Sequence, residues 1–318
     1  MPITRSPIPL DSSTFLIDVG QDGLWNANGV YLIEADRRCL IDGGTQADAP
    51  RVVQTLREMG AFPPDVVVLT HSHHDHAQGI PLLREEAARA GKGLEVYASR
   101  KALAALAEPP QTGFQGAVPH ASIRDVIPLD EGDTLDLGST RLRVYDVPGH
   151  LPDHIAILGE RTKNLFVGDA IGGQFGENAF IPFFWAPFWD TDAFYASVDK
   201  LRQVDYHTLC LAHFGPVYGD PARTLLDRAV AAFDQWWGIL EANQDRLDET
   251  GYLVDEILAA TGLTAPRLET VSFLRGAGLA AITAWNKLIH GPSWSVGKLF
   301  VPGFVRGQVA CYRAYTKG

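Results

Sequence analysis

Residues 70–79 read THSHHDHAQG, and this stretch decides how the rest of the chain is interpreted. Four of the ten histidines lie here, directly after VVVLT (66–70), a β-branched run typical of a strand buried on both faces. Side chains alternate along an extended backbone, so His71 and His73 should point to the same side. Asp75 and His76 come where a helix should begin and can face a neighbouring point. Neutral imidazoles and a carboxylate suit zinc, iron or manganese, and the stretch predicts two adjacent metal centres.

The simpler alternative is a solvated polar loop, or one buried histidine with three exposed ones. The ligand types and their spacing favour the metal interpretation. His74 should point away from His71 and His73, so we expect it to lie beside the ligands or to face solvent.

Three distant residues each follow a probable buried strand. His150 follows LRVYDV (142–147) and a Pro-Gly turn, Asp169 follows NLFVG (164–168), and His213 follows TLCLA (208–212). Gly168 permits close approach of the backbone just before Asp169. One such residue alone is more often only hydrogen-bonded at a strand end, but in layered α/β folds strand ends assemble sites. Together with residues 71–76, they predict one shared centre.

The pattern H-x-H-x-D-H, then histidine after Pro-Gly, then Gly-Asp, then histidine resembles the metallo-β-lactamase superfamily. The resemblance covers about residues 14–215. It implies an α/β fold, an αββα sandwich with the site at one edge of two packed sheets. It also implies a ligand set: His71, His73 and His150 for the first metal, Asp75, His76 and His213 for the second, and Asp169 as the bridge.

The resemblance extends to residues that support the ligands. Asp42 in LIDGG matches an early aspartate of the family, although it could simply be a turn residue after a strand. We expect His154 to pack or to hydrogen-bond near the site rather than to bind metal. The chain departs from the family by having Gln78 and Asp153 where glycine is common. Neither departure removes a ligand.

The ligand set predicts a dinuclear metallohydrolase. Two divalent ions about 3.5–4 Å apart can hold a hydroxide between them and polarise a substrate oxygen. Zinc is the favoured metal, with iron and manganese as alternatives. Asp75 and Asp169 are the candidate catalytic carboxylates, and Asp75 would orient the water or take its proton. An ester-like bond, in a lactone or thioester, is the favoured substrate.

Other functions on the same fold remain as alternatives: a phosphodiester or β-lactam hydrolase, an iron-dependent oxidoreductase, or a non-catalytic binding protein. Flavodiiron oxidoreductases place glutamate where His73 stands and carry a flavodoxin module. Only 103 residues follow Gly215 (318 − 215 = 103), too few for that module. Non-catalytic members usually lose ligands, whereas all seven are present.

Residues 180–195 read FIPFFWAPFWDTDAFY, and the prolines forbid a regular helix in the first part. We interpret this segment as an apolar wall over a hydrophobic substrate. Ordinary core or a dimer contact is an equally open alternative. The candidate substrate-binding residues are Phe183, Trp185, Phe188 and Trp189. The aromatic stretch 231–240 (AAFDQWWGIL) could cap the site or join subunits.

Composition sets the broader expectations. A net charge of −11 argues against nucleic acid as a partner. No apolar run approaches a membrane span and no secretory signal is visible, so we expect no membrane partner and a cytoplasmic location. Three scattered cysteines read as reduced core thiols. We expect a small-molecule substrate and a possible homodimer.

Hydrophobic periodicity predicts alternating elements. Strands are expected at 14–19, 29–34, 38–42, 66–70, 94–98, 142–147, 154–159, 164–170 and 208–215. Helices are expected at 47–60, 79–91, 99–107 and 191–203, and beyond Pro221 through about residue 290. These patterns divide the chain into a catalytic domain at 1–220 and a mainly helical extension at 221–318. Residues 292–318, rich in glycine and aromatics, fit no pattern.

Overall fold

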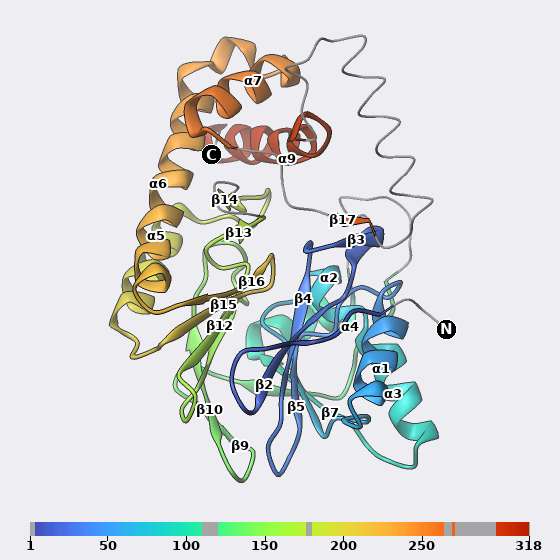
Figure 1. Ribbon diagram of the computed structural model, residues 1–318. Helices are drawn as coiled ribbons and strands as arrows, with labels where there is room; N and C mark the ends of the chain where they lie inside the picture. Colours follow the sequence, from blue (N-terminus) through green and yellow to red (C-terminus); the bar gives the residue numbers. More distant parts are fainter. Residues whose placement is uncertain (1–3, 110–119, 176–179, 264–268, 271–296, 318) are drawn as a thin grey trace.

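Two β-sheets pack face to face, and helices cover the outer face of each sheet (Figure 1). This computed structural model describes the chain except for residues 1–3, 110–119, 176–179, 264–268, 271–296 and 318. The arrangement confirms the αββα sandwich and the helical C-terminal extension.

The first sheet has the order β1-β2-β4-β5-β6-β7-β8 and is parallel from β5 onward. Its strands are β1 (Ile8–Pro9), β2 (Thr14–Asp18), β4 (Gly29–Ile33), β5 (Cys39–Ile41), β6 (Val66–Val68), β7 (Glu95–Ser99) and β8 (Val126–Leu129). The second sheet has the order β16-β15-β12-β11-β10-β9, and β12 runs parallel to β15. Its strands are β9 (Thr134–Asp136), β10 (Arg141–Asp146), β11 (Ile155–Gly159), β12 (Asn164–Gly168), β15 (Thr208–Leu211) and β16 (Gly215–Tyr218).

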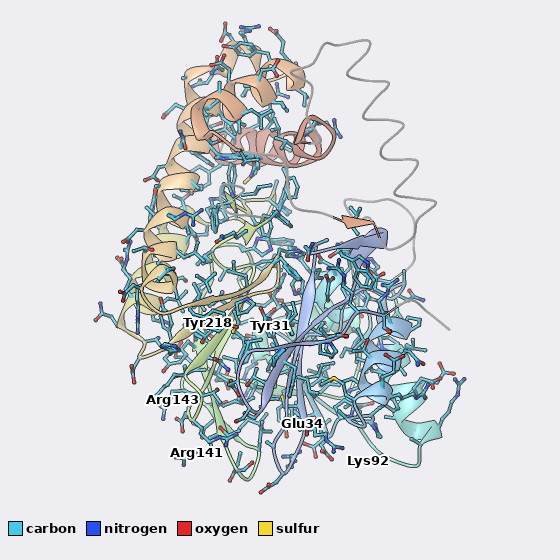
Figure 2. The ribbon with its side chains drawn as sticks, viewed as in Figure 1. Tyr31, Glu34, Lys92, Arg141, Arg143 and Tyr218 are labelled. Carbon is cyan, nitrogen blue, oxygen red and sulfur yellow. The ribbon has the colours of Figure 1, made fainter. Side chains whose placement is uncertain are left out.

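Side-chain alternation builds the core in layers. In β11, Ile155 and Ile157 face the first sheet, while Ala156 and Leu158 face the outer helices. A buried hydrogen bond also joins the sheets: the hydroxyl of Tyr31 donates to the carbonyl of Leu211 on β15 at 2.6 Å. Figure 2 labels Tyr31, which lies on β4. The space between the two sheets is therefore filled by side chains, so a functional site must lie at an edge of the sandwich.

Helices α1 (Ala49–Glu58), α3 (Ile80–Arg89) and α4 (Leu103–Ala107) pack on the first sheet, and α5 (Thr191–Gln203) and α6 (Asp220–Ala242) pack on the second. Helices α7 (Thr250–Thr261) and α9 (Gly297–Lys317) pack on each other and on α6. Short elements complete the description: α2 (His74–Ala77), β3 (Leu24–Trp25) paired with β17 (Glu269–Thr270), β13 (Gly173–Gln174) paired with β14 (Phe180–Ile181), and the 3₁₀ turns 21–23, 100–102 and 244–246.

Several expectations are corrected. The prediction of helix through residue 290 is wrong at β17, because Glu269 and Thr270 pair with β3. Residues 264–268 and 271–290 of that prediction lie outside the described part of the chain. Residues 297–317 of the unassigned stretch form α9. Strands β8 and β9 were missed because each is short and partly exposed. The aromatic stretch 231–240 sends Phe233 and Trp236 into the core of its own chain.

All three cysteines are free and buried, as expected. Among the helices of the described residues, none combines the length and the apolar character needed to cross a bilayer. The proposed boundary near residue 220 stays a prediction, since α6 shares one core with α5.

Candidate metal centre

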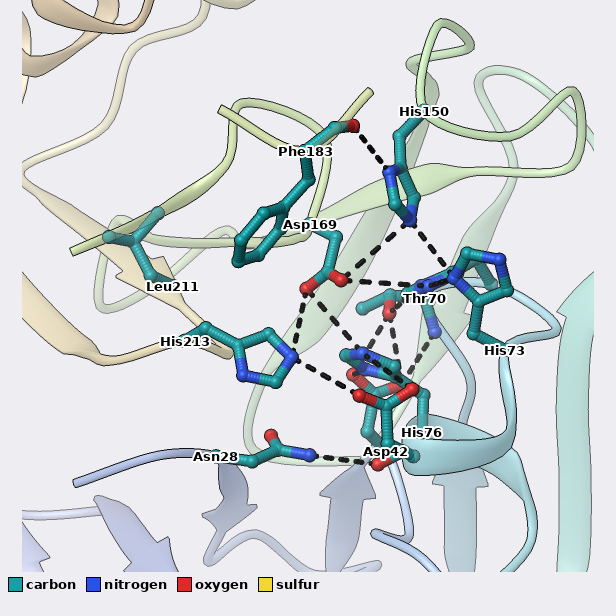
Figure 3. Close-up of polar contacts among 12 residues, drawn as sticks. Asn28, Asp42, Thr70, His73, His76, His150, Asp169, Phe183, Leu211 and His213 are labelled. Carbon is teal, nitrogen blue, oxygen red and sulfur yellow. Dashed lines mark hydrogen bonds and ion pairs between the residues drawn. The ribbon is translucent and has the colours of Figure 1, made fainter. Parts of the chain in front are cut away.

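The predicted ligands follow strands whose ends meet at one edge of the sandwich. His71 to His76 come after β6 of the first sheet, and His150, Asp169 and His213 come after β10, β12 and β15 of the second. Because β10, β12 and β15 run in the same direction, their C-terminal ends lie at the same edge. The centre is thus built jointly by both sheets (Figure 3).

The seven side chains form two clusters: His71, His73, His150 and Asp169, and Asp75, His76 and His213. Within each cluster the candidate ligand atoms all lie within 4.8 Å of one another. In the first cluster, His73 Nδ1 lies 3.0 Å from His71 Nε2 and 3.0 Å from His150 Nε2. In the second, His213 Nε2 lies 3.4 Å from Asp75 Oδ2, and His76 Nε2 lies 3.8 Å from Asp75 Oδ1.

Asp169 lies between the two clusters (Figure 3). Its Oδ2 is 3.7 Å from His150 Nε2 and 4.0 Å from His71 Nε2. Its Oδ1 is 3.4 Å from His76 Nε2 and 3.5 Å from His213 Nε2. Each oxygen therefore faces a different cluster, which is the arrangement that a bridging carboxylate requires.

The histidine tautomers suit a metal centre. Four histidines have an oxygen partner at Nδ1: His150 has the carbonyl of Phe183 (2.8 Å), His213 that of Ala27 (2.6 Å), His76 the carboxylate of Asp42 (2.9 Å) and His71 the hydroxyl of Thr70 (3.1 Å). A proton on Nδ1 leaves Nε2 with a free lone pair, and all four Nε2 atoms face the clusters. His76 Nε2 and Asp169 Oδ1 are buried without a hydrogen-bond partner. These unsatisfied atoms fit two divalent cations.

The pKa values of the histidines differ between the two clusters. Burial lowers the pKa of His71 and His150 and lowers the pKa of His73 to about 3, so these imidazoles are neutral and ready to bind a cation. Burial alone would also lower the pKa of His76, but the carboxylates of Asp169, Asp42 and Asp75 together raise it well above its ordinary value. Without a cation this ring therefore keeps a proton on Nε2, which a bound cation would displace. Burial would raise the pKa of Asp169, but His213 and His76 lower it. The carboxylates are thus held ionised.

Asp42 and Thr70 hold ligands of both clusters. Asp42 accepts hydrogen bonds from the Thr70 backbone N–H at 2.7 Å and from the Thr70 hydroxyl at 2.9 Å, besides its bond with His76. The Thr70 hydroxyl in turn accepts from His71 Nδ1. Asp42 therefore contacts a ligand of one cluster directly, and Thr70 links it to the other cluster.

His154 lies beside the centre and outside both clusters. Its Nε2 accepts a hydrogen bond from the backbone N–H of Asp169 at 3.1 Å, and its ring stacks on His71 with centroids 4.5 Å apart. Gly168 makes this contact possible, because a Cβ there would lie 2.9 Å from the His154 ring and 2.6 Å from the Thr70 hydroxyl. His74 is partly exposed and stacks on His120, as expected for a residue that points away.

The four aromatic candidates occupy different places. Phe183 lies at the metal ligands, with its ring 5.4 Å from the His213 ring and 6.3 Å from the His150 ring (Figure 3). Trp185 packs against Phe304 of α9. Phe188 is 54% exposed. Trp189 packs with Phe184, Phe194 and Phe233 in the helical core, so the ordinary-core alternative describes it best.

The sequence reasoning missed several contributors. Asn28 donates from Nδ2 to the backbone carbonyl of Asp75 at 2.9 Å, and Gln21 Nε2 lies 3.5 Å from Asp75 Oδ2. Phe175 lies 6.2 Å from the His213 ring. No local pattern marks these residues. The position of Thr70 directly before His71 could have indicated a role beside the ligands, but the sequence pattern indicated only a strand residue.

Several known proteins are similar to this chain. The family model described as the metallo-beta-lactamase superfamily matches residues 23–213. A hydroxyacylglutathione hydrolase of Gloeobacter violaceus is 31% identical over 144 residues, covering 45% of this chain and 49% of that protein. One of Methylobacterium nodulans is 34% identical over 124 residues, covering 39% and 40%. The chain thus matches half or less of the length of these two relatives.

Solved structures agree on the fold. A metallo-β-lactamase variant from Cronobacter sakazakii superposes with a TM-score of 0.58 at 16% identity, covering 75% of this chain and 99% of that chain. An archaeal superfamily protein from Sulfolobus tokodaii gives 0.55 at 22% identity, covering 68% and 85%. The family match over more than half of the chain, on this geometry, shows that the chain belongs to the metallo-β-lactamase superfamily.

Proposed function

We propose that this chain is a dinuclear metal-dependent hydrolase that cleaves an ester-like bond, with a thioester as the favoured substrate and a lactone as the next candidate. The observation that carries the proposal is the position of Asp169, whose two oxygens face two separate ligand clusters. A carboxylate so placed can hold two cations close together, as two-metal hydrolytic sites require.

The relatives favour the thioester. Both compared relatives are named hydroxyacylglutathione hydrolase. Their identity to this chain falls on about half of their length, so the acyl-bond chemistry is the part of their activity that we propose for this chain. The glutathione moiety is not included, because the matched stretches cover only 49% and 40% of these two proteins.

Two bound divalent ions would supply a Lewis acid for the acyl oxygen and a water of lowered pKa. The chain's own residues then orient the reactants. His76 and His213 lie beside the carboxylate of Asp75, and Asn28 bonds to its backbone carbonyl. Burial would raise the pKa of Asp75, but His76, His213 and His74 outweigh this effect, so the pKa lies well below its ordinary value. A carboxylate held ionised in this way orients the attacking water better than it stores a proton. The role that we propose for Asp75 is therefore to orient the attacking water through its carboxylate oxygens.

The surroundings favour an apolar acyl group. The rings of Phe183 and Phe175 lie against the ring of His213, and both are almost fully buried. They keep bulk water from one side of the centre, which strengthens its electrostatic interactions. The donor set of imidazole and carboxylate favours zinc, with iron and manganese as the alternatives.

Two ligand variants test the proposal. His150→Ala should weaken the first cluster, and Asp169→Ala should weaken both. We expect at least about a hundredfold lower kcat/KM for an acyl thioester and less bound zinc, because several kcal/mol of charge stabilisation are lost. His207→Ala is the matched control, since this histidine is exposed between α5 and β15. Metal content and thioester turnover at the level of the unsubstituted chain in both ligand variants would refute the proposal.

A further inference from the structure

A stack of aromatic rings runs from the metal ligands to the C-terminal helix. Phe183 contacts His213 edge to face at 5.4 Å, and Phe304 of α9 stacks on Phe183 with centroids 5.9 Å apart and planes at 6°. Phe175 lies 6.4 Å from each of these two rings. A residue more than 120 positions after Phe183 thus belongs to the immediate surroundings of the centre.

Specific contacts hold Phe304 in this place. Gln308, one turn further along α9, is fully buried and donates from Nε2 to the carbonyl of Pro182 at 2.7 Å. The Trp185 ring lies on Gly307 so closely that a Cβ there would be 2.1 Å from Trp185 Cζ3. Val301 and Val305 are fully buried on the same helix. Helix α9 is therefore fixed to the segment 180–185 that borders the metal ligands.

Exposure singles out Phe304 within the stack. Phe183 is 5% exposed and Phe175 is 9% exposed, because neighbouring rings cover them. Phe304 is only partly buried, so it presents the accessible apolar face of this group. The rings that contact it in the described part of the chain, Phe175, Phe183 and Trp185, are uncharged. A charged or strongly polar substrate group placed there would lose water without gaining a partner.

We propose that Phe304 is a specificity-determining residue, which receives the apolar acyl chain of the substrate beside Phe183. This inference rests on the proposed function and narrows its substrate class to thioesters or esters of medium-length aliphatic acyl groups. An acetyl group would end at the metal ligands, whereas a longer chain would reach Phe304. Each methylene that leaves water on this surface can favour binding by up to about fourfold.

The kinetic test uses the zinc-loaded protein and acyl thioesters of one thiol, from acetyl to decanoyl. We expect kcat/KM to rise with chain length in the unsubstituted chain. Phe304→Ala should flatten this rise, with a loss of ten- to a hundredfold for decanoyl and less than about twofold for acetyl. Phe304→Leu keeps an apolar side chain, so its kcat/KM for decanoyl should lie between those of the unsubstituted chain and Phe304→Ala. Tyr315→Ala, which removes an exposed aromatic of the same helix, is the control.

A binding test separates this inference from the proposed function. Calorimetry measures the affinity of the zinc-loaded protein for alkanoates from acetate to decanoate, which needs no turnover. A chain-length dependence that Phe304→Ala reduces and Tyr315→Ala retains supports the inference, even if no thioester is hydrolysed. The same dependence in Phe304→Ala overturns it, as does an equal loss for acetate and decanoate. Phe304→Leu serves this test as well if the alanine variant does not fold.

Discussion

At the scale of single residues, the centre depends on which ring nitrogen of each histidine carries the proton. His71, His76, His150 and His213 each have an oxygen partner at Nδ1, so each Nε2 is left free to bind a cation. Three of these partners come from distant parts of the chain, whereas Thr70 directly precedes its histidine. Phe183 and Ala27 supply their oxygen through the backbone. Such partners fix both the tautomer and the direction of a ligand.

Asp42→Asn and Thr70→Val should weaken different clusters. Asp42 bonds to His76 at 2.9 Å, so its amide variant should lower metal affinity mainly in the cluster of Asp75, His76 and His213. Thr70 bonds to His71, so its valine variant should act mainly on the other cluster. Loss of such a partner typically costs about 10- to 100-fold in metal affinity.

Competition with a chromophoric chelator measures both affinities separately. Asp42→Asn should leave one tight and one weakened site, and Thr70→Val should do the same for the opposite cluster. His207→Ala, an exposed histidine, should bind as the unsubstituted chain does. If neither variant changes either affinity, these contacts do not support the ligands.

The sequence predicted all seven clustered residues because histidine and aspartate at strand ends are rare enough to attract notice. It did not predict Asn28 or Phe175, since an asparagine or a phenylalanine carries no such signal. Asn28 matters only because it directly precedes β4, which places its side chain beside the backbone of Asp75. Contacts of this kind are set by tertiary packing rather than by local spacing.

At the scale of elements, the connection between β2 and β4 is tied by one buried carboxylate. Asp18 is 7% exposed and accepts hydrogen bonds from the backbone N–H groups of Gly20 (3.0 Å) and Asn26 (2.8 Å). Burial raises the pKa of Asp18 to about 6, although these donors and the charges of Arg5 and Arg51 oppose the shift. The folded chain therefore binds this proton more tightly than the unfolded chain does.

This raised pKa makes stability depend on pH. The contribution of Asp18 to the free energy of unfolding is fully present below about pH 4 and is lost as the pH rises through about 6. Relative to Asp18→Asn, the unsubstituted chain should gain on the order of 3 kcal/mol between pH 7 and pH 4. Urea unfolding of both proteins across this range measures the difference.

Asp11→Asn provides a control of opposite sign. Burial would raise the pKa of Asp11, but hydrogen bonds from Ser13 and Asn164 lower it. Its contribution is therefore present at neutral pH and lost as the pH falls. A parallel pH dependence in the Asp18→Asn variant and the unsubstituted chain would show that Asp18 is not protonated in the folded protein near pH 5.

The sequence of helix α9 explains why no helix was predicted there. Its sequence GKLFVPGFVRGQVACYRAYTK contains three glycines and a proline, which are the residues least favourable in a helix interior. Packing against α6 and α7 overrides that propensity, with Val301, Val305 and Val309 buried. Gly307 is needed there because Trp185 occupies the space of a side chain.

A pair of glycine substitutions tests this packing. Gly307→Ala should destabilise the chain by about 1–3 kcal/mol, because its Cβ would collide with the Trp185 ring. Gly238→Ala on α6 has no heavy atom within 4 Å of its added Cβ and should stabilise the chain by about 0.5–1 kcal/mol. Denaturant midpoints give both values. A Gly307→Ala variant that is as stable as the unsubstituted chain, or more stable, would show that α9 does not pack closely on Trp185.

At the scale of the whole molecule, the metal centre joins the two halves of the sandwich. Four of the seven clustered side chains, His71, His73, Asp75 and His76, follow a strand of the first sheet, and the other three follow strands of the second. Each cluster draws on both sheets, so each bound cation links them. Alternating strands and helices predicted sheets covered by helices, and the family resemblance implied that two sheets pack together. The direct contact between the sheets, such as that of Tyr31 with Leu211, follows only from the folded register.

Metal removal should therefore lower the stability of the entire fold. Ligands that bind only the folded state stabilise it by about 4 kcal/mol each at a thousandfold excess over the dissociation constant. We expect a chelator to lower the thermal midpoint by on the order of 10 °C, and added zinc to restore it. Asp169→Ala should respond much less, because it lacks the carboxylate that faces both clusters. Calorimetric midpoints that are equal with and without chelator would mean that the folded chain holds no metal at these seven side chains.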